Sequence, residues 1–435
     1  MTKDDIIKAA FKVWGRDLYR TTSLTEIARE LGVSKPALYR HFRDKDALLD
    51  AMNSAFFDDC AGFIKEGYEK AIKAKNKRKS YLVWLRTLAG YYAQNRDAFI
   101  FSLTRVFSNR DRLSLHKEFL DRSIDFGHFT LSEELPAPYP SKMQLGMATS
   151  IFCLAEFHKR EYEKGGAAAK SGSAAKSGSR AEKINNSLLI EVEKFVTGGL
   201  CLNKKKVSSL KYNDLEQRAA SGFSAGYEDT ETNNLLKAVA EAVAEAGPWN
   251  ASMEMVARRS GLSKSGLYAH FKNKQDMLTR LFIAEFTTIV KFAKAQIETS
   301  TVSEEQLYLA IISIVNYLRS RPEILVALDW IKTGRLDLGK DVPAYLGRVI
   351  GTIKIEAIRN FDRKMLVRIA QWILFMIVNT LALWRRDENP HGGSSLTKNR
   401  VKKCKDISWA SNAAEIPNES FRILFRFIAL GLEGL

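Results

Sequence analysis

The chain has 435 residues, enough for two to four domains of ordinary size with substantial cores. Hydrophobic residues make up 46% and charged residues 27%, a balance that excludes a chain disordered throughout. Lysine and arginine number 67 against 50 acidic residues, and the resulting net charge of +17 favours an anionic partner, either nucleic acid or a membrane surface.

The first 51 residues carry a strong helical pattern. The N-terminus runs directly into apolar residues at helical spacing, so no signal peptide is expected. Ser23-Leu24-Thr25-Glu26 has the spacing of a capping box and predicts the start of a second helix, which Gly32 ends. Ser34 is a candidate N-cap for a short third helix over 35–41, and Asp44 for a fourth. Two short helices joined by a glycine turn predict a helix-turn-helix.

The short third helix has a buried side and an exposed side. Leu38 and Phe42 are four residues apart and are expected to anchor it to the core. The residues left outside near its N-terminus are those that a helix-turn-helix presents to the major groove, namely Lys35, Pro36, Ala37, Tyr39 and Arg40. A lysine there suits guanine or phosphate, and Lys45 adds a positive charge at the start of the fourth helix.

The rest of the chain predicts further helices and two low-complexity segments, so the expected fold class is all-α. Apolar residues recur at helical spacing over 142–163, 184–200, 363–386 and 419–433, where a domain core or a four-helix interface would bury them. Residues 165–181 are predicted to be a flexible insertion and 387–418 a flexible loop. Residues 201–233 have weak apolar periodicity and are expected to form a linker with at most one short helix.

The second half of the chain repeats the first. Ser34–Lys45 aligns with Ser263–Lys274 at a spacing of 229, and seven of the twelve positions are identical. Both halves carry an excess of basic residues, and similar segments end them, Phe195–Leu200 and Phe427–Leu432. Whole domains are therefore duplicated.

The order of residues in the first copy resembles the TetR family of transcriptional regulators. The likeness is clearest in Thr22-Ser23, Ile27-Ala28, Gly32-Val33-Ser34, Leu38-Tyr39-Arg40-His41-Phe42 and Lys45-Asp46-Ala47-Leu48-Leu49. The second copy keeps Gly261, Ser263, Leu267-Tyr268, His270-Phe271 and Lys274, but departs from the family pattern at Gly247-Pro248-Trp249 and Ala251-Ser252.

The resemblance implies tandem units, each with a helix-turn-helix domain, an effector pocket among its middle helices and pairing through its last two helices. The expected domains are 1–51 and 52–200 for the first copy, a linker over 201–233, and 234–280 and 281–435 for the second. The DNA-contacting residues it implies are Thr22, Ser34, Lys35, Pro36, Ala37, Tyr39, Arg40, His41, Lys45, Ser263, Lys264, Ser265, Gly266, Tyr268, His270 and Lys274. Aromatic residues that fall where the family places its pocket are Trp84, Tyr91, Tyr92, Phe99, Tyr308, Tyr317, Trp330 and Trp372, although plain core packing is the alternative for each.

Other classes of protein are weakly supported. Phosphate-binding loops, metal-ligand clusters and nucleophile elbows are missing from the sequence, so no enzyme activity, metal or cofactor is expected. The four cysteines, Cys60, Cys153, Cys201 and Cys404, are far apart, which fits a reducing cytoplasm. Residues 366–384 approach the length of a membrane span, but basic residues crowd both ends, and a buried helix is preferred.

The sequence therefore predicts a DNA-binding transcriptional regulator, a repressor released by a small hydrophobic or aromatic effector. One chain carries both DNA-reading domains, so we expect a monomer with an internal pseudo-dimer and an operator of double-stranded DNA that is an imperfect palindrome. One alternative is an interaction or sensor protein that kept the fold without specific DNA reading. The other is a regulator held at a membrane by 366–384.

Overall fold

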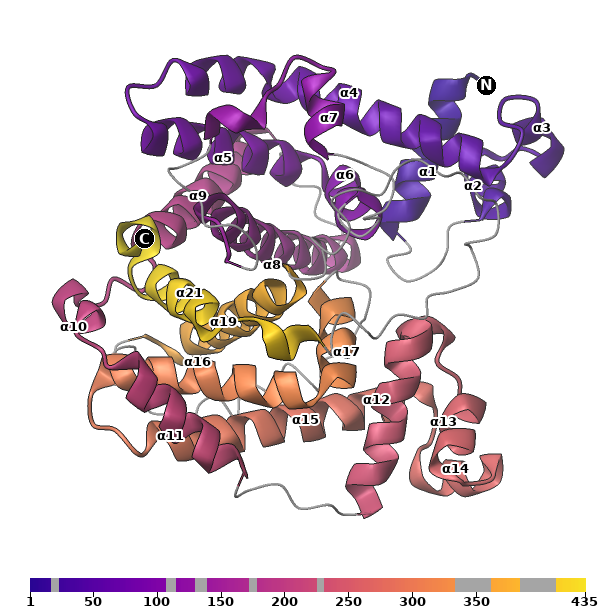
Figure 1. The fold of residues 1–435 in the computed structure, drawn as a ribbon. Helices are drawn as coiled ribbons and strands as arrows, with labels where there is room; N and C mark the ends of the chain where they lie inside the picture. The colour runs from indigo at the N-terminus through magenta and orange to yellow at the C-terminus, as the bar shows by residue number, and fades with distance from the viewer. Residues whose placement is uncertain are drawn as a thin grey trace. The chain divides into compact units, whose positions relative to one another are not determined.

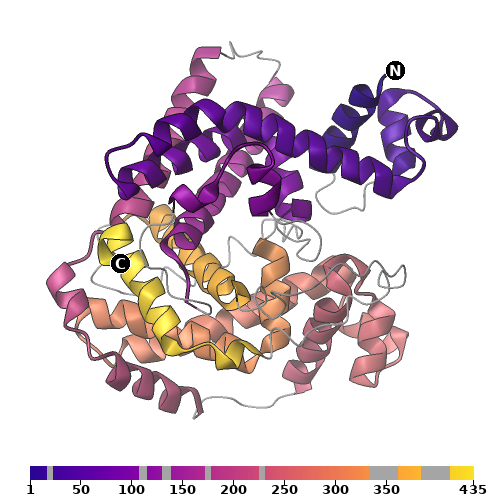
Figure 2. The same cartoon turned by 45° about the horizontal axis from the view of Figure 1, so that its top comes forward.

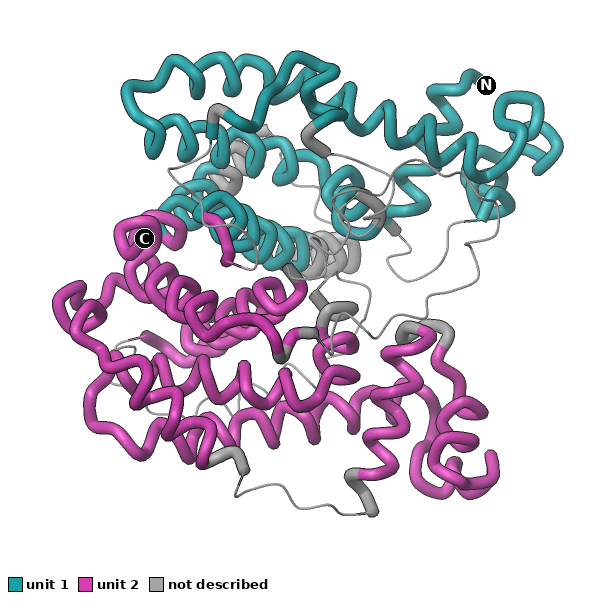
Figure 3. The backbone as a smooth tube through the Cα atoms, viewed as in Figure 1, with its two compact units in different colours: residues 1–134, 142–194, 333–335 teal, residues 135–141, 195–332, 336–435 magenta. Residues whose placement is uncertain are grey.

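A computed structural model describes residues 1–16, 23–106, 115–129, 139–171, 178–224, 231–332, 361–383 and 412–435. Over these residues the chain is helical and forms no strand, which confirms the all-α class. The backbone divides into two compact units, shown in Figure 3. Unit 1 comprises Met1–Glu134, Lys142–Lys194 and Thr333–Arg335, and unit 2 comprises Leu135–Ser141, Phe195–Lys332 and Leu336–Leu435.

Unit 1 begins with three helices of the helix-turn-helix and continues into a bundle of longer ones (Figures 1 and 2). Its helices are α1 (Lys3–Arg16), α2 (Leu24–Leu31), α3 (Lys35–Tyr39), α4 (Lys45–Ile72), α5 (Lys77–Gln94), α6 (Arg96–Phe101), α7 (Leu115–Leu120), α8 (Lys142–Ser171) and α9 (Gly178–Gly198), of which the last turn lies in unit 2. A π-helical turn, Ser102–Val106, follows α6, and a 3-10 turn, Phe126–Phe129, follows α7.

Aromatic side chains join the helix-turn-helix of unit 1 to its bundle. The Phe101 ring, fully buried on α6, lies 4.9 Å from the Phe11 ring and 5.5 Å from the Trp14 ring of α1. The Trp14 indole also donates a hydrogen bond to Thr104 Oγ1 at 2.7 Å. These contacts place α1, the supporting helix of the helix-turn-helix, directly against α6.

Unit 2 begins with two helices of its own, α10 (Lys204–Ser208) and α11 (Tyr212–Ser224). They are followed by α12 (Glu231–Asn250), α13 (Met253–Ser260), α14 (Lys264–His270), α15 (Lys274–Ile297), α16 (Ser303–Ser320), α17 (Pro322–Lys332), α19 (Arg363–Leu383) and α21 (Asn418–Leu430). From α12 onward the unit repeats the order of the first helices of unit 1. Helix α12 packs along α17 as α1 packs along α6, and α15 pairs with α16 as α4 pairs with α5.

The segment expected to be a linker, 201–233, forms two helices in the structure, and the longer of them, α11, belongs to unit 2. Leu215 and Ala219 of α11 are each 1% exposed, and the helix packs on α15 and α16. Glu216 accepts hydrogen bonds from Tyr308 Oη at 2.6 Å and from Arg422 Nε at 2.7 Å. The sequence predicted at most one short helix here because only two apolar residues are buried among the described side chains of α11, which is too few for a clear helical pattern. The contacts that hold α11 on the rest of unit 2 are largely polar, and such contacts leave no periodic signal in the sequence.

The two low-complexity segments have different outcomes. Both ends of the predicted flexible insertion, 165–181, are helical, because α8 extends through Ser171 and α9 begins at Gly178. Residues 172–177 lie outside the described residues, as does the predicted loop 387–418 up to residue 411. A 3-10 turn, Asn412–Glu415, then leads into α21. The domain boundaries inferred from the sequence stay predictions.

Inside unit 2, the end of the first copy crosses the end of the second. Leu200 N donates to Ile428 O at 2.8 Å, and Leu202 N donates to Ala429 O at 3.0 Å. Gly199 and Gly431 have φ of +55° and +62°, and a Cβ on Gly199 would lie within 2.8 Å of three backbone atoms of 427–431. Only glycine fits such a close backbone approach in the left-handed region. The similar chain ends found in the sequence thus pack against each other.

Helix α19 accounts for the apolar run at 366–384. Among the described residues one helical segment, Arg363–Ala382, is long and apolar enough to cross a membrane. Ile369, Trp372, Met376, Ile377 and Leu381 on this helix are at most 1% exposed. Helix α19 packs against α16, α17 and α21, as expected for a core helix.

Candidate nucleic-acid interface

We call residues 23–45 the first head and residues 252–274 the second head. In the first head, Ser23 Oγ accepts from Glu26 N at 3.2 Å and Glu26 Oε2 accepts from Ser23 N at 2.9 Å, so the predicted capping box is present. Gly32 adopts φ +65° and turns the chain between α2 and α3. Asp44 Oδ1 caps α4 through Ala47 N at 2.8 Å. These local signals set both ends of α2 and the start of α4, and α3 lies between them.

Helix α3 has the two sides that the sequence predicted. Leu38 is 1% exposed and Phe42 6%, whereas Tyr39 is 45% exposed. Lys35, Pro36 and Arg40 are also exposed, and Ala37 and His41 are partly so. The ammonium of Lys35 lies 5.9 Å from the centroid of the Tyr39 ring. A cation and a phenol thus stand next to each other on the exposed side of the helix.

The second head is built the same way from different residues. Ser252 Oγ caps α13 through Met255 N at 3.2 Å, and Gly261 turns the chain at φ +70°. Leu267 is fully buried while Tyr268 is 48% exposed. Ser263, Lys264, Ser265 and His270 are exposed, and Gly266 and Lys274 are partly exposed. Figure 1 shows α13 and α14 beside α12.

The two heads differ in the hydrogen bonds of their exposed groups. Ser263 Oγ accepts from Gly266 N at 3.0 Å and lies 3.0 Å from Ser265 Oγ. The side chain of Ser34, at the equivalent place in the first head, makes no such capping bond. Lys264 Nζ forms an ion pair with Glu254 Oε1 at 2.8 Å. This pair raises the pKa of Lys264 and lowers the pKa of Glu254.

Glu254 is a charged residue of this surface that the motif analysis missed. Its counterpart at the spacing of 229 is Thr25, the second residue of α2, as Glu254 is the second residue of α13. Direct comparison of the two copies at each aligned position would have found it. One predicted residue, Thr22, lies outside the described residues. The assignment of individual residues to DNA contacts stays a prediction.

The aromatic residues assigned to an effector pocket are buried in the two units. Of these residues, those with described side chains are at most 5% exposed, namely Trp84, Tyr91, Tyr92, Phe99, Tyr308, Tyr317 and Trp372. The side chain of Trp330 lies outside the described part of the structure. Trp84 stacks on Phe129 with ring centroids 4.8 Å apart.

Three of these aromatics are tyrosines that donate hydrogen bonds to carboxylates. Tyr91 donates to Asp59 at 2.8 Å, Tyr308 to Glu216 at 2.6 Å, and Tyr317 to Glu285. Burial is the main cause that raises the pKa of Tyr91 and Tyr308. Burial also raises the pKa of Glu285, although Arg321 stands 3.1 Å away. These hydroxyls are engaged inside the packed units.

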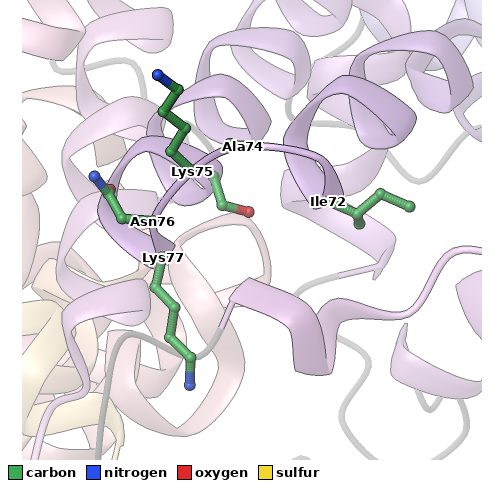
Figure 4. Close-up of a pocket in the computed structure, with 6 residues that line it drawn as sticks. Ile72, Ala74, Lys75, Asn76 and Lys77 are labelled. Atoms are coloured by element: carbon green, nitrogen blue, oxygen red, sulfur yellow. The ribbon is translucent and has the colours of Figure 1, made fainter.

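Two hollows in the described residues lie away from these aromatics. One of about 220 Å³ surrounds the turn between α4 and α5, and Figure 4 shows Ile72, Lys75, Asn76 and Lys77 around it. The other, about 500 Å³, lies between α10 and the start of α16. Neither is lined by a predicted pocket residue, and the pocket assignment stays a prediction. The described residues hold no cluster of three or more potential metal ligands.

Relatives of known class match parts of this chain. One is a Bacillus subtilis protein described as an uncharacterized HTH-type transcriptional regulator, YuxN, 28% identical over 130 residues, which are 30% of this chain and 36% of the relative. Another is the fatty acid metabolism regulator protein of Bacillus subtilis, 22% identical over 34% of this chain and 81% of the relative. The chain thus matches about a third of the length of the first relative and most of the second.

Two solved structures of similar proteins cover nearly half of the chain. They are the transcriptional regulator FadR of Bacillus subtilis in complex with stearoyl-CoA and the fatty acid degradation regulator FadR of Bacillus halodurans. Each is 16% identical, with TM-scores of 0.33 and 0.31, over 46% and 48% of this chain and 99% and 98% of the respective structure.

The family model described as bacterial regulatory proteins, tetR family, matches residues 6–52 and 235–281. These two ranges contain both heads together with most of the helices α1 and α12 that support them. The chain therefore carries, in tandem, two segments that match the model of the tetR family of bacterial regulatory proteins.

Proposed function

We propose that this protein is a sequence-specific DNA-binding transcriptional regulator that acts as a single-chain pseudo-dimer in the cytoplasm. The observation that carries the proposal is the duplicated head, in which an exposed lysine and an exposed tyrosine stand on a short helix after a glycine turn. A helix-turn-helix places such residues in the major groove, and paired heads read two half-sites. The crossing of 195–202 with 427–431 supports pairing within one chain.

The two heads present different side chains to DNA, so the proposed operator is an imperfect palindrome. The first offers Lys35, Pro36, Ala37 and Arg40, and the second offers Lys264, Ser265, Gly266 and Ala269. Arg40 reaches a guanine edge or a phosphate, whereas Ala269 reaches neither. A wrong base at a well-read position costs about 1–3 kcal/mol, so these differences are large enough to produce unlike half-sites.

Selection of bound duplexes from a random DNA pool tests this proposal. We expect enrichment of one sequence with two related but unequal halves. Replacing 264–266 and 269 with the residues of 35–37 and 40 should make the halves more alike without altering their spacing. A control chain with Lys35→Ala, Tyr39→Ala, Lys264→Ala and Tyr268→Ala should enrich nothing. Enrichment by that control contradicts DNA reading by these four residues. No enrichment by the native chain contradicts specific reading by the heads and favours an interaction or sensor protein.

We also propose that a small hydrophobic effector releases the DNA, which would make the protein a repressor. The similarity to a relative named for fatty acid metabolism makes fatty acyl compounds the first molecules to test. The predicted pocket residues are packed tightly, so an effector must displace part of this packing to enter. Adding stearoyl-CoA to the selected complex should then lower DNA affinity, and a Trp84→Ala variant should respond at a different concentration. Unchanged affinity at saturating stearoyl-CoA argues against acyl effectors.

A further inference from the structure

Glu254 places a negative charge on a surface that otherwise suits phosphate. It is the second residue of α13, it is exposed, and its carboxylate holds Lys264 at 2.8 Å. The two side chains are 70% and 56% exposed, so DNA has access to both. In a helix-turn-helix the first helix crosses the DNA backbone and the second enters the groove with its N-terminal residues. Glu254 and Lys264 occupy these two places in the second head.

The first head has no such carboxylate at the equivalent position. Thr25 replaces Glu254, and Lys35 lies over the ring of Tyr39. The Ser34 side chain makes no capping bond, whereas Ser263 is already bonded to Gly266 N. Two groups of the second head that we predict to contact DNA, Lys264 and Ser263, are thus engaged within the protein.

We propose that Glu254 weakens the electrostatic grip of the second head, so that the first head anchors the chain on DNA and the second engages where its base contacts compensate. This inference rests on the proposed DNA binding. A phosphate that binds Lys264 must replace Glu254, and the displaced carboxylate then stands near the phosphate backbone. The lysine therefore adds less to non-specific affinity than Lys35 does. In this scheme Glu254 lowers the affinity of the second head for DNA of any sequence, so this head stays bound only where its base contacts make up the loss.

The reciprocal exchange of residues 25 and 254 tests the inference. In the full chain, Glu254→Thr gives the second head the residue of the first, and Thr25→Glu does the reverse. Affinity for a 30-base-pair duplex of arbitrary sequence is measured by fluorescence anisotropy between 50 and 200 mM salt. Each phosphate contact contributes about −0.9 to the slope of log affinity against log salt.

We expect Glu254→Thr to make this slope more negative by about 0.9, the value for one phosphate contact. Over that salt range the affinity of this variant should then fall about 3.5-fold further than the affinity of the native chain. Thr25→Glu should flatten the slope by a similar amount. Glu254→Gln keeps the shape of the side chain without its charge and should match Glu254→Thr. Circular dichroism melts verify that the exposed substitutions leave the chain folded.

The outcomes separate this inference from the proposed function. Equal slopes for the native chain and all three variants overturn the inference while DNA binding stands. A slope that changes in Glu254→Thr but not in Glu254→Gln also overturns it, because charge is then not the cause. Failure of the native chain and every variant to bind duplex DNA overturns the proposed function and the inference together.

Discussion

Among single residues, His158 stands out because it is a buried ionisable group in unit 1. It is 8% exposed on α8, and its ring lies 5.2 Å from the rings of both Phe99 and Phe157. Its Nε2 is 2.8 Å from Tyr92 O, and since a carbonyl only accepts, Nε2 carries the proton of the neutral ring. Burial is the main cause that lowers the pKa of His158 to about 4.

We expect unit 1 to lose stability as pH falls from about 6.5 to 4. The unfolded chain takes up a proton at His158 near pH 6.5, but the folded chain does not until about pH 4. The folded state is therefore penalised by up to about 3 kcal/mol at the acid end of this window. Urea unfolding at several pH values measures this, and His158→Gln should reduce the dependence over that window. An equal pH dependence in both proteins would mean that His158 is not responsible.

Glycine provides a second prediction at this scale. Gly431→Ala should destabilise unit 2 by about 2 kcal/mol or more, because its Cβ meets the backbone of Thr197 and Gly198 and its φ is positive. Gly90→Ala is the matched control, since it lies within α5 with open space around its Cβ and should stabilise its helix by about 1 kcal/mol. Thermal melts compare the two variants. A harmless Gly431→Ala would contradict the close crossing of the two chain ends.

At the scale of elements, the docking of α11 depends on one carboxylate. Glu216 has an 11% exposed side chain and accepts from Tyr308, from Asn418 at 3.0 Å and from two nitrogens of Arg422. Burial alone would raise the pKa of Glu216, but the hydrogen bonds from Arg422, Tyr308 and Asn418 outweigh it and lower the pKa. The ionised form is thus the one that holds α11 in place.

Removal of this carboxylate should release α11. We expect Glu216→Ala to cost about 3 kcal/mol, because it leaves Arg422 without a buried partner. Since the folded-state pKa is lowered, the contribution of Glu216 is complete above pH 4.5 and is lost as pH falls through the folded value. Hydrogen exchange of the α11 amides measures the release. Asp214→Ala, an exposed change on the same helix, should leave exchange unaltered; equal protection in Glu216→Ala would contradict the role of this residue.

A comparison of the two heads with α11 shows which features the sequence could predict and which it could not. Short-range signals such as Ser23 with Glu26, Gly32 and Asp44 specify local geometry, so both heads were predictable within a residue or two. The partners of Glu216 lie at positions 308, 418 and 422, and no local pattern connects them. Lys264 and Glu254 are ten residues apart on different helices, so their pairing depends on the turn between them.

At the scale of the whole molecule, the duplication predicts a protein that functions as one chain. The last turn of α9 and the residues after it pack in unit 2, with the Phe195 ring 4.9 Å from the Trp372 ring. We therefore expect sedimentation equilibrium of the free protein to give a mass near 49.1 kDa. On DNA, we expect one chain to bind each operator. A stable species of twice that mass would indicate that each copy pairs with another chain.

The joining of both heads in one chain also has a consequence for how mutations act. In a homodimer every substitution appears on both sides of the two-fold axis, so a change that improves one half-site contact alters the other as well. Here codon 25 and codon 254 are separate, and they already encode threonine and glutamate. Selection can therefore change the residues of one head, and the DNA sequence that it prefers, without changing the other head. Where the two chain ends cross, the separate codons have a cost. Glycine must be retained at both codon 199 and codon 431, and a substitution at either one is enough to disturb the crossing.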